Sequence, residues 1–155
     1  MKLGDVLKKE RERKEFAVEQ MAAELGVPVD EYRELEAGSS TIEQWGPRLA
    51  QIAIGLSIPT SRLISETGKS AQAKRHDSQC GGLIKFHRER QELDQEALAR
   101  SVEIPVSELN SIEAGKSPLE HYAPLLLRFA ELIEQPIFNL FYPCGLRLDQ
   151  LEDYP

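Results

Sequence analysis

Apolar residues recur every three or four positions along most of this chain, among charged and polar ones. Near the N-terminus Val6, Leu7 and Phe16 follow this spacing, and further along Leu83 and Ile84 do the same. A period near 3.6 places such residues on one side of an α-helix, whereas a half-buried strand alternates apolar and polar residues. No stretch of the sequence alternates in that way. The pattern therefore predicts an all-α protein.

Glycine and proline divide this helical pattern into short segments. Glycine commonly follows the last turn of a helix, because it adopts the left-handed conformation without strain. Proline is accepted in a first helical turn, where its missing N–H costs no hydrogen bond. These signals predict five short helices in each half of the chain. The predicted helix ends are Gly26, Gly38 and Gly115, and the predicted starts are Pro28, Pro47, Pro59, Pro105, Pro124 and Pro136.

The two sets of helices come from an internal repeat. Residues 3–64 align on residues 80–141 without a gap, at an offset of 77, and we call them the first copy and the second copy. The segment VDEYRELEAG of the first copy, for example, corresponds to VSELNSIEAG of the second. A fixed period of this kind marks a duplicated structural unit. The sequence thus predicts a domain over 1–64, a polar linker over 65–79, a domain over 80–141 and a C-terminal tail over 142–155.

Composition narrows the class of protein. Apolar residues make up 41% of the 155 residues and charged residues 29%, as in a globular protein with a buried core. The charged N-terminus lacks an apolar stretch of signal-peptide length, and no apolar run is long enough to span a bilayer. We therefore expect a cytoplasmic protein with no membrane partner. The net charge of −7 argues against a general binder of polyanions but leaves room for a local basic patch.

Side chains that carry catalysis or bind metals are sparse. Cys80 and Cys144 lack the CxxC spacing, and His76, His87 and His121 have no cysteine or carboxylate at ligand spacing. The chain also shows no phosphate-binding loop and no set of side chains typical of a nucleophilic enzyme. The sequence thus predicts a protein that is not an enzyme and that holds neither a metal nor a cofactor.

The run DQEALARSVEIPVSELNSIEAGKS in the second copy resembles the helix-turn-helix of the XRE/Cro-type family. The matching features are Gln95-Glu96, Leu98-Ala99, a tight turn, a second helix and the closing Glu-x-Gly-Lys of residues 113–116. The first copy keeps part of this pattern, including Glu-Ala-Gly at 36–38. The resemblance implies two tandem five-helix, lambda-repressor-like DNA-binding domains. It also implies a transcriptional regulator whose partner is double-stranded DNA.

In that family the second helix of the motif enters the major groove, and residues around it contact phosphates. Serine and asparagine can hydrogen-bond to base edges, and valine can meet a thymine methyl group. Glu108 lies among the groove residues and is the acidic exception. The set that the resemblance implies is Gln95, Lys116, Ser117, Arg90 and Arg100 for the DNA backbone, and Val106, Ser107, Asn110 and Ser111 for the groove.

The resemblance also implies two structural ion pairs. Arg11 and Arg88 match a position in the first helix that pairs with the glutamate closing the helix-turn-helix, here Glu36 and Glu113. Both pairs recur at the offset of 77. We therefore expect two partly buried pairs that hold the fold together and take no part in chemistry.

The first copy departs from the DNA-binding pattern. Val18 replaces the glutamine, Ser39 replaces the lysine, and Asp30, Glu31 and Glu34 lie on the helix expected in the groove. Carboxylates repel phosphates, and each phosphate contact that is not made forfeits the release of counterions. The second copy is therefore the expected DNA reader.

Two further readings stay open. The acidic balance favours the alternative of a protein–protein interaction module that keeps the helix-turn-helix fold without reading DNA. The two copies also suggest a built-in dimer, whose reading helices would lie about 34 Å apart to meet successive major grooves. A homodimer or another protein partner is compatible with either reading.

Overall fold

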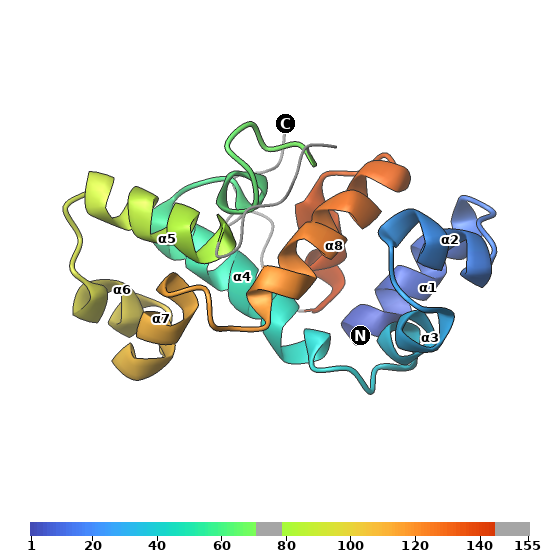
Figure 1. Cartoon of the computed structure of the whole chain (residues 1–155), viewed down its shortest axis with the longest axis horizontal. Helices are drawn as coiled ribbons and strands as arrows, with labels where there is room; N and C mark the ends of the chain where they lie inside the picture. The colour runs from blue at the N-terminus through green and yellow to red at the C-terminus, as the bar shows by residue number, and fades with distance from the viewer. Residues whose placement is uncertain (71–78, 145–155) are drawn as a thin grey trace.

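The computed structural model of the chain describes residues 1–70 and 79–144, and this part contains helices and no strand (Figure 1). The prediction of an all-α protein is confirmed for these residues. Of the predicted linker and tail, residues 71–78 and 145–155 lie outside the described part. The first copy forms α1 (Leu3–Arg13), α2 (Val18–Leu25), α3 (Val29–Ala37), α4 (Ile42–Leu56) and the 3₁₀ helix η1 (Thr60–Leu63). The second forms α5 (Gln79–Arg90), α6 (Gln95–Ser101), α7 (Val106–Glu113), α8 (Leu119–Leu132) and η2 (Ile137–Leu140), followed by η3 (Tyr142–Cys144).

The backbone repeats as well as the sequence. Non-glycine residues with a left-handed φ are uncommon, because Cβ crowds the backbone there. In this chain, residues with a left-handed φ, glycine or not, occur at matching places after helices of both copies. At one of these places the first copy has a glycine and the second has a glutamate. The pairs, with φ in degrees, are Glu15 (60) and Glu92 (58), Gly26 (73) and Glu103 (59), Gly38 (75) and Gly115 (75), and Ser57 (53) and Glu134 (57).

The fourth helix of each copy begins earlier than the prolines predicted. α4 starts at Ile42 and α8 at Leu119, which leaves Pro47 and Pro124 inside the helices. The predicted starts were wrong because a hydroxyl group upstream satisfies the first free N–H. The Oγ of Ser40 accepts a hydrogen bond of 3.1 Å from the N–H of Ile42. A proline inside a helix removes one backbone hydrogen bond, and the buried side of α4 offsets that loss.

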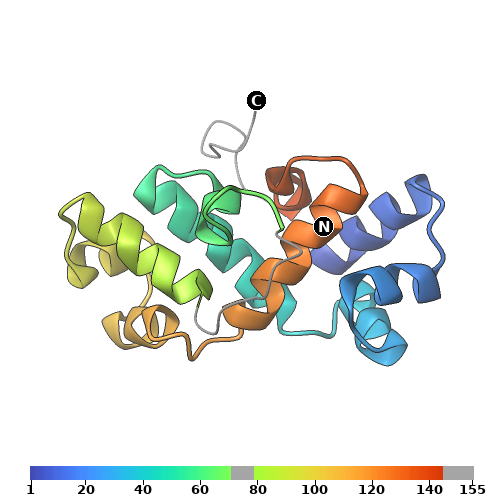
Figure 2. The same ribbon diagram turned by 45° about the horizontal axis from the view of Figure 1, so that its top comes forward.

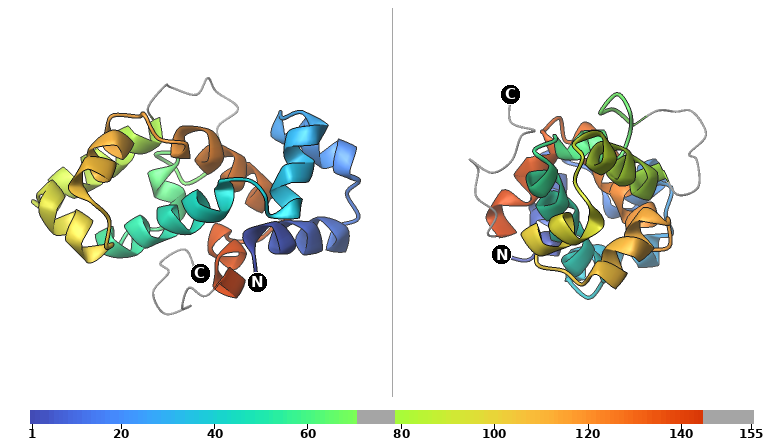
Figure 3. Two further views of the ribbon diagram at one scale, coloured as in Figure 1. Left: turned by 90° about the horizontal axis from the view of Figure 1, so that it is seen from below. Right: turned by 90° about the vertical axis from the view of Figure 1, so that its left-hand side faces the viewer.

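The two copies are interleaved around α4 and α8. These helices pack against each other at the centre of the molecule (Figure 1). From there α4 reaches α5 and α6, whereas α8 reaches α2, and η1 and η2 pack against α5 and α1 respectively. Figures 2 and 3 show the same exchange from other directions. We call α1–α3 with the end of α8 and η2 the first lobe, and α5–α7 with the end of α4 and η1 the second lobe.

Two glycines let α4 approach both lobes closely. A Cβ atom added to Gly46 would lie 2.7 Å from Cδ2 of Leu3 in α1. One added to Gly55 would lie 3.0 Å from Cγ1 of Val102, at the end of α6. Side chains of both copies therefore pack into one hydrophobic core. That core crosses the boundaries at residues 64 and 80 that separate the copies in the sequence.

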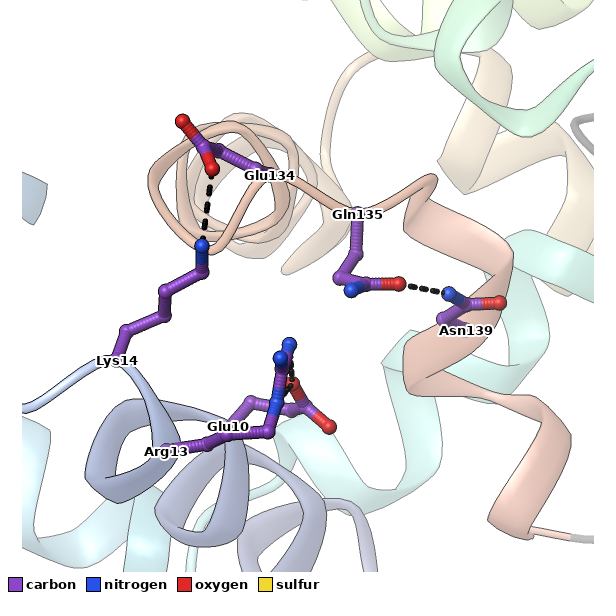
Figure 4. Close-up of polar contacts among 6 residues, drawn as sticks. All are labelled: Glu10, Arg13, Lys14, Glu134, Gln135 and Asn139. Atoms are coloured by element: carbon purple, nitrogen blue, oxygen red, sulfur yellow. Dashed lines mark hydrogen bonds and ion pairs between the residues drawn. The ribbon is translucent and has the colours of Figure 1, made fainter.

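Ion pairs at the surface join α8 and its C-terminal end to the first copy. Arg128 lies 3.1 Å from Glu24 of α2. Lys14, directly after α1, lies 2.9 Å from Glu134, two residues after the end of α8 (Figure 4). The hydrogen bond from Lys14 lowers the pKa of the Glu134 carboxyl group. Exposed pairs of this kind stabilise a fold only slightly. They are consistent with the packing of α8 on the first lobe but contribute little to its stability.

Candidate nucleic-acid interface

The outer side of α7 carries three of the residues expected to read DNA. Ser107, Asn110 and Ser111 are exposed, and they share one side of the helix because they lie three and four positions apart. The opposite side is anchored in the core by Leu109 and Ile112, which have no exposed surface. The helix therefore presents uncharged hydrogen-bonding groups to the outside on a rigid support.

The first turn of α7 is less open. Val106 is half-buried and packs against the core. Glu108 is also half-buried, and its carboxylate lies 3.6 Å from Nη1 of Arg48 in α4. Because α4 comes from the first copy, that copy supplies a positive charge to the one acidic side chain among the groove residues. Opposite charges at this distance offset much of each other's field at the surface.

Three exposed cations belong to the helices that pack against α7 or to the segment after it. They are Arg90 in α5, Arg100 in α6 and Lys116 after α7, and none of them forms an ion pair with another residue in 1–70 or 79–144. The guanidinium of Arg90 lies 5.8 Å from the centre of the Phe86 ring, which is itself exposed. Ser117 is half-buried, and its Oγ accepts a hydrogen bond of 3.2 Å from the N–H of Leu119. Its own O–H is still able to donate to a phosphate.

Gln95 lies at the start of α6 and is held in place by an ion pair. Its Nε2 donates a hydrogen bond of 3.0 Å to Oε1 of Glu113. Glu113 in turn accepts from Nε and Nη2 of Arg88 at 2.7 and 2.9 Å. Arg88 also donates to the carbonyl oxygen of Leu93 at 2.8 Å. The ends of α5 and α7 and the start of α6 are thereby joined by one buried polar network.

The same network, without the glutamine, holds the first copy together. Nε and Nη2 of Arg11 donate to Glu36 at 2.6 and 3.1 Å, and Nη1 donates to the carbonyl oxygen of Phe16 at 2.8 Å. The hydrogen bonds to glutamate raise the pKa of both arginines. Val18 occupies the place of Gln95 and packs against the core. Both pairs are well shielded from solvent, so they support the helices and are not a contact surface.

The matching side of α3 has a different chemistry. Asp30, Arg33 and Glu34 are exposed there. Arg33 lies 3.4 Å from Glu19 of α2, so its charge is already paired. Glu31 lies 2.9 Å from Nε2 of His121 in α8. Histidine carries a positive charge only when protonated, whereas the arginine that faces Glu108 is always charged.

Each copy has one glutamate that caps the N-terminus of its first helix, and neither of them was predicted from the sequence. Glu43 of α4 accepts hydrogen bonds from the N–H groups of Leu3 and Gly4 at 2.8 and 2.7 Å. Glu120 of α8 does the same for Cys80 and Gly81, at 3.2 and 2.8 Å. A carboxylate at a helix N-terminus accepts hydrogen bonds from the free backbone N–H groups and is attracted to the positive end of the helix dipole. The signal was available, because the glutamate and the glycine both recur at the offset of 77.

Residues 1–70 and 79–144 hold no group of three or more His, Cys, Asp or Glu side chains arranged to bind a metal. The helices of the same residues are too short or too polar to cross a membrane. Both cysteines are free thiols. Burial raises the pKa of the Cys80 thiol, so that cysteine stays protonated and unreactive.

Comparison with known proteins found no matching family model, no matching curated protein and no matching solved structure.

Proposed function

We propose that the protein is a non-enzymatic transcription regulator of the cytoplasm that binds double-stranded DNA through α7. The helices of the two copies are, in this proposal, tandem lambda-repressor-like units of the XRE/Cro type. One observation carries the proposal: α7 exposes an uncharged polar side, and three exposed cations in α5, in α6 and after α7 have no ion-pair partner among the described residues. The resemblance of the α6–α7 sequence to a helix-turn-helix supports it.

The chemistry of this surface suits a duplex. Lys116, Arg90 and Arg100 would lie against phosphates, where each neutralised phosphate releases counterions. Ser107, Asn110 and Ser111 would then face base edges, and an asparagine amide can form paired hydrogen bonds with adenine. Arg48 limits the repulsion between Glu108 and the DNA backbone. The buried network around Glu113 keeps α6 and α7 at a fixed angle, so little ordering is needed on binding.

The test is selection from a random pool of duplex DNA, followed by a salt titration on the selected sequence. Wild-type protein is expected to enrich a sequence and to lose affinity steeply as salt rises. Lys116→Ala should weaken binding to all sequences and lower the salt slope by about 1, since one phosphate contact is lost. Asn110→Ala should instead relax the preference for one base while leaving the salt slope unchanged.

Lys9→Ala is the matched control, because Lys9 is an exposed lysine of α1 and its loss changes the net charge by the same amount. It should leave the affinity within about twofold of wild type, as expected for a charge outside the interface. Equal losses in Lys9→Ala and Lys116→Ala would show that binding is a non-specific effect of charge. If the wild-type protein binds no DNA even at low salt, the proposed function is rejected.

A second candidate is a protein–protein interaction module that keeps the fold without reading DNA. The outer side of α3 favours it, since Asp30 and Glu34 are exposed there and would repel phosphates. A protein that retains no duplex at any salt concentration but forms a stable complex with a basic partner would establish this function.

A further inference from the structure

The two helices that end in Glu-Ala-Gly occupy matching places in the molecule. α3 and α7 lie at opposite ends along the same edge, on either side of the α4–α8 pair (Figures 1 and 2). Each is tied to the first helix of its copy by the same arginine–glutamate pair. Each also contacts the fourth helix of the other copy through its first-turn glutamate. The chain thus holds two equivalent positions for a reading helix.

The side chains at these two positions are not equivalent. Three exposed positions on α7 carry Ser107, Asn110 and Ser111, and the same positions on α3 carry Asp30, Arg33 and Glu34. The position of Lys116, which has no ion-pair partner among the described residues, is Ser39 in the first copy. A symmetric protein dimer reads an inverted repeat because both of its helices carry the same side chains. This chain likewise has two matching helices, but only α7 carries the side chains expected to read DNA.

We propose that the protein reads a DNA site without two-fold symmetry, in which α7 occupies one half-site and α3 makes no base contact. This inference rests on the proposed function. Two exposed carboxylates on α3 and the absence of a lysine after it remove the attraction for phosphates that a second reader needs. The first copy supports the second lobe through α4, and its Arg48 faces Glu108 at the edge of the reading surface. The target is therefore a single half-site, not a palindrome.

The experiment transplants the α7 side chains into α3. The variant Asp30→Ser/Arg33→Asn/Glu34→Ser/Ser39→Lys copies each residue from the position 77 further along, and all four positions are exposed. Wild type is first used to select a half-site from random duplex DNA, and its footprint is mapped. Both proteins are then titrated with duplexes carrying that half-site alone or with an inverted second copy. The centres of the two half-sites are set at separations from about one to two helical turns.

Wild type should select a sequence with no inverted repeat, protect one half-site and bind both types of duplex equally well per half-site. The transplanted variant should bind the inverted repeat at least about tenfold more tightly at one separation, roughly what one correctly read base pair contributes. It should gain no comparable advantage on the single half-site. Glu15→Gln/Glu66→Gln is the control, because it raises the net charge by the same two units at exposed positions outside α3. That control should show no preference for the inverted repeat.

An inverted repeat selected by wild type, with protection of both halves, would overturn the inference. A transplanted variant that gains nothing at any separation would overturn the part of the inference that assigns the asymmetry to the side chains of α3, because α3 would then not lie where a second reader must. Both results leave the proposed function intact. Retention of no DNA by wild type rejects the proposed function and this inference together.

Discussion

Arg88 donates three hydrogen bonds from one guanidinium group, two to Glu113 and one to the carbonyl oxygen of Leu93. Its fork of donors suits this task, because a carboxylate accepts two parallel hydrogen bonds from arginine and leaves the third nitrogen for a neighbour. Little solvent reaches the pair: 8% of Arg88 and 7% of Glu113 is exposed. Removing one partner would leave the other charge buried and uncompensated.

Glu113→Ala is therefore expected to lower the free energy of unfolding by about 3–5 kcal/mol, the usual cost of breaking a buried pair. Urea denaturation followed by circular dichroism measures the change. Glu19→Ala, which removes a partner from the exposed pair with Arg33, is the control and should cost less than about 1 kcal/mol. An equal decrease in the free energy of unfolding in both variants would show that the buried network stabilises the fold no more than the exposed pair does.

His87 is expected to make the stability of the fold depend on pH. It is buried in α5, and its Nδ1 has no hydrogen-bond partner within the described part of the chain. Burial lowers its pKa, and the charges of Arg90 and Arg62 lower it further. The unfolded chain takes up this proton near pH 6.5, whereas the folded chain takes it up only at lower pH. Between these values the unfolded state binds more protons, so stability should fall as the pH falls below about 6.5.

His87→Gln should lose less stability than wild type between pH 7 and pH 5, as measured by thermal or urea unfolding at each pH. His121→Gln is the matched control, because His121 is exposed, and it should keep most of the acid sensitivity of wild type. A wild-type protein whose stability is unchanged over this range would contradict the prediction.

At the scale of the helices, α1 and α5 pack against the third helix of their copy through a glycine. A Cβ atom added to Gly81 would lie 2.1 Å from the carbonyl oxygen of Ile112, and one added to Gly4 would lie 2.4 Å from that of Leu35. No side chain fits at these distances, so the helices must separate if one is introduced. The N–H groups of the same two glycines donate to Glu120 and Glu43. Close packing and helix capping therefore meet at one residue in each copy.

Gly81→Ala is expected to lower the free energy of unfolding by about 1–3 kcal/mol, since the new methyl group overpacks the contact with α7. Its neighbour Gly82 is an internal control, because a Cβ atom there would meet nothing within 4 Å. Gly82→Ala should raise stability by up to about 1 kcal/mol through helix propensity. Denaturation of both variants tests the pair, and a gain in stability on Gly81→Ala would show that α5 and α7 do not pack this closely.

The helices themselves follow from local signals. Apolar spacing predicted them, and Gly26, Gly38 and Gly115 have the left-handed φ that ends a helix. The prolines gave the wrong start for the fourth helix. In the first copy the helix begins at Ile42, because the Ser40 hydroxyl accepts a hydrogen bond from its N–H and its side chain is buried, and neither feature is visible from the position of a proline. The exchange of α4 and α8 between the lobes could not be predicted from the sequence, for a different reason. Periodicity shows which side of a helix is buried, but not which helix buries it.

Of the residues that the resemblance placed in the groove, Ser107, Asn110 and Ser111 are exposed on one side of α7, whereas Val106 is half-buried. The sequence did not identify the partner of Glu108. Arg48 lies sixty residues away in the first copy and reaches α7 only through the interleaving of α4. A contact between distant segments depends on how the lobes are joined, and the repeat by itself is compatible with separate or exchanged helices.

At the scale of the whole molecule, each lobe depends on helices from both copies. The end of α4 packs on α6 through Gly55, and η1 packs on α5. The Nε2 of Gln79 donates to the carbonyl oxygen of Ile64 at 2.9 Å, and that of Gln91 donates to the carbonyl oxygen of Leu56 at 2.6 Å. Without the first copy, apolar surface of α5 and α6 would face water.

Fragments 1–78 and 79–155 are therefore expected to unfold without a cooperative transition when each is alone, since about sixty to eighty residues with an incomplete core are marginal. Mixed in equal amounts they should regain helical circular dichroism and a cooperative melt, because the missing helices are supplied by the partner fragment. Full-length protein is the reference. A sharp melt of fragment 79–155 alone, near the temperature of the full chain, would contradict this expectation.

The sharing of α4 has a consequence for how this chain can change over generations. A duplicated unit that stands alone can be deleted once its original task is gone. Here deletion of the first copy would remove α4 from α6 and Arg48 from Glu108. We therefore expect the first copy to be retained for its buried side, while its outer side is free to diverge. A copy with a buried, largely apolar interior and an altered exterior, such as Asp30 and Glu34 opposite the buried Tyr32 and Leu35, is the expected record of that constraint.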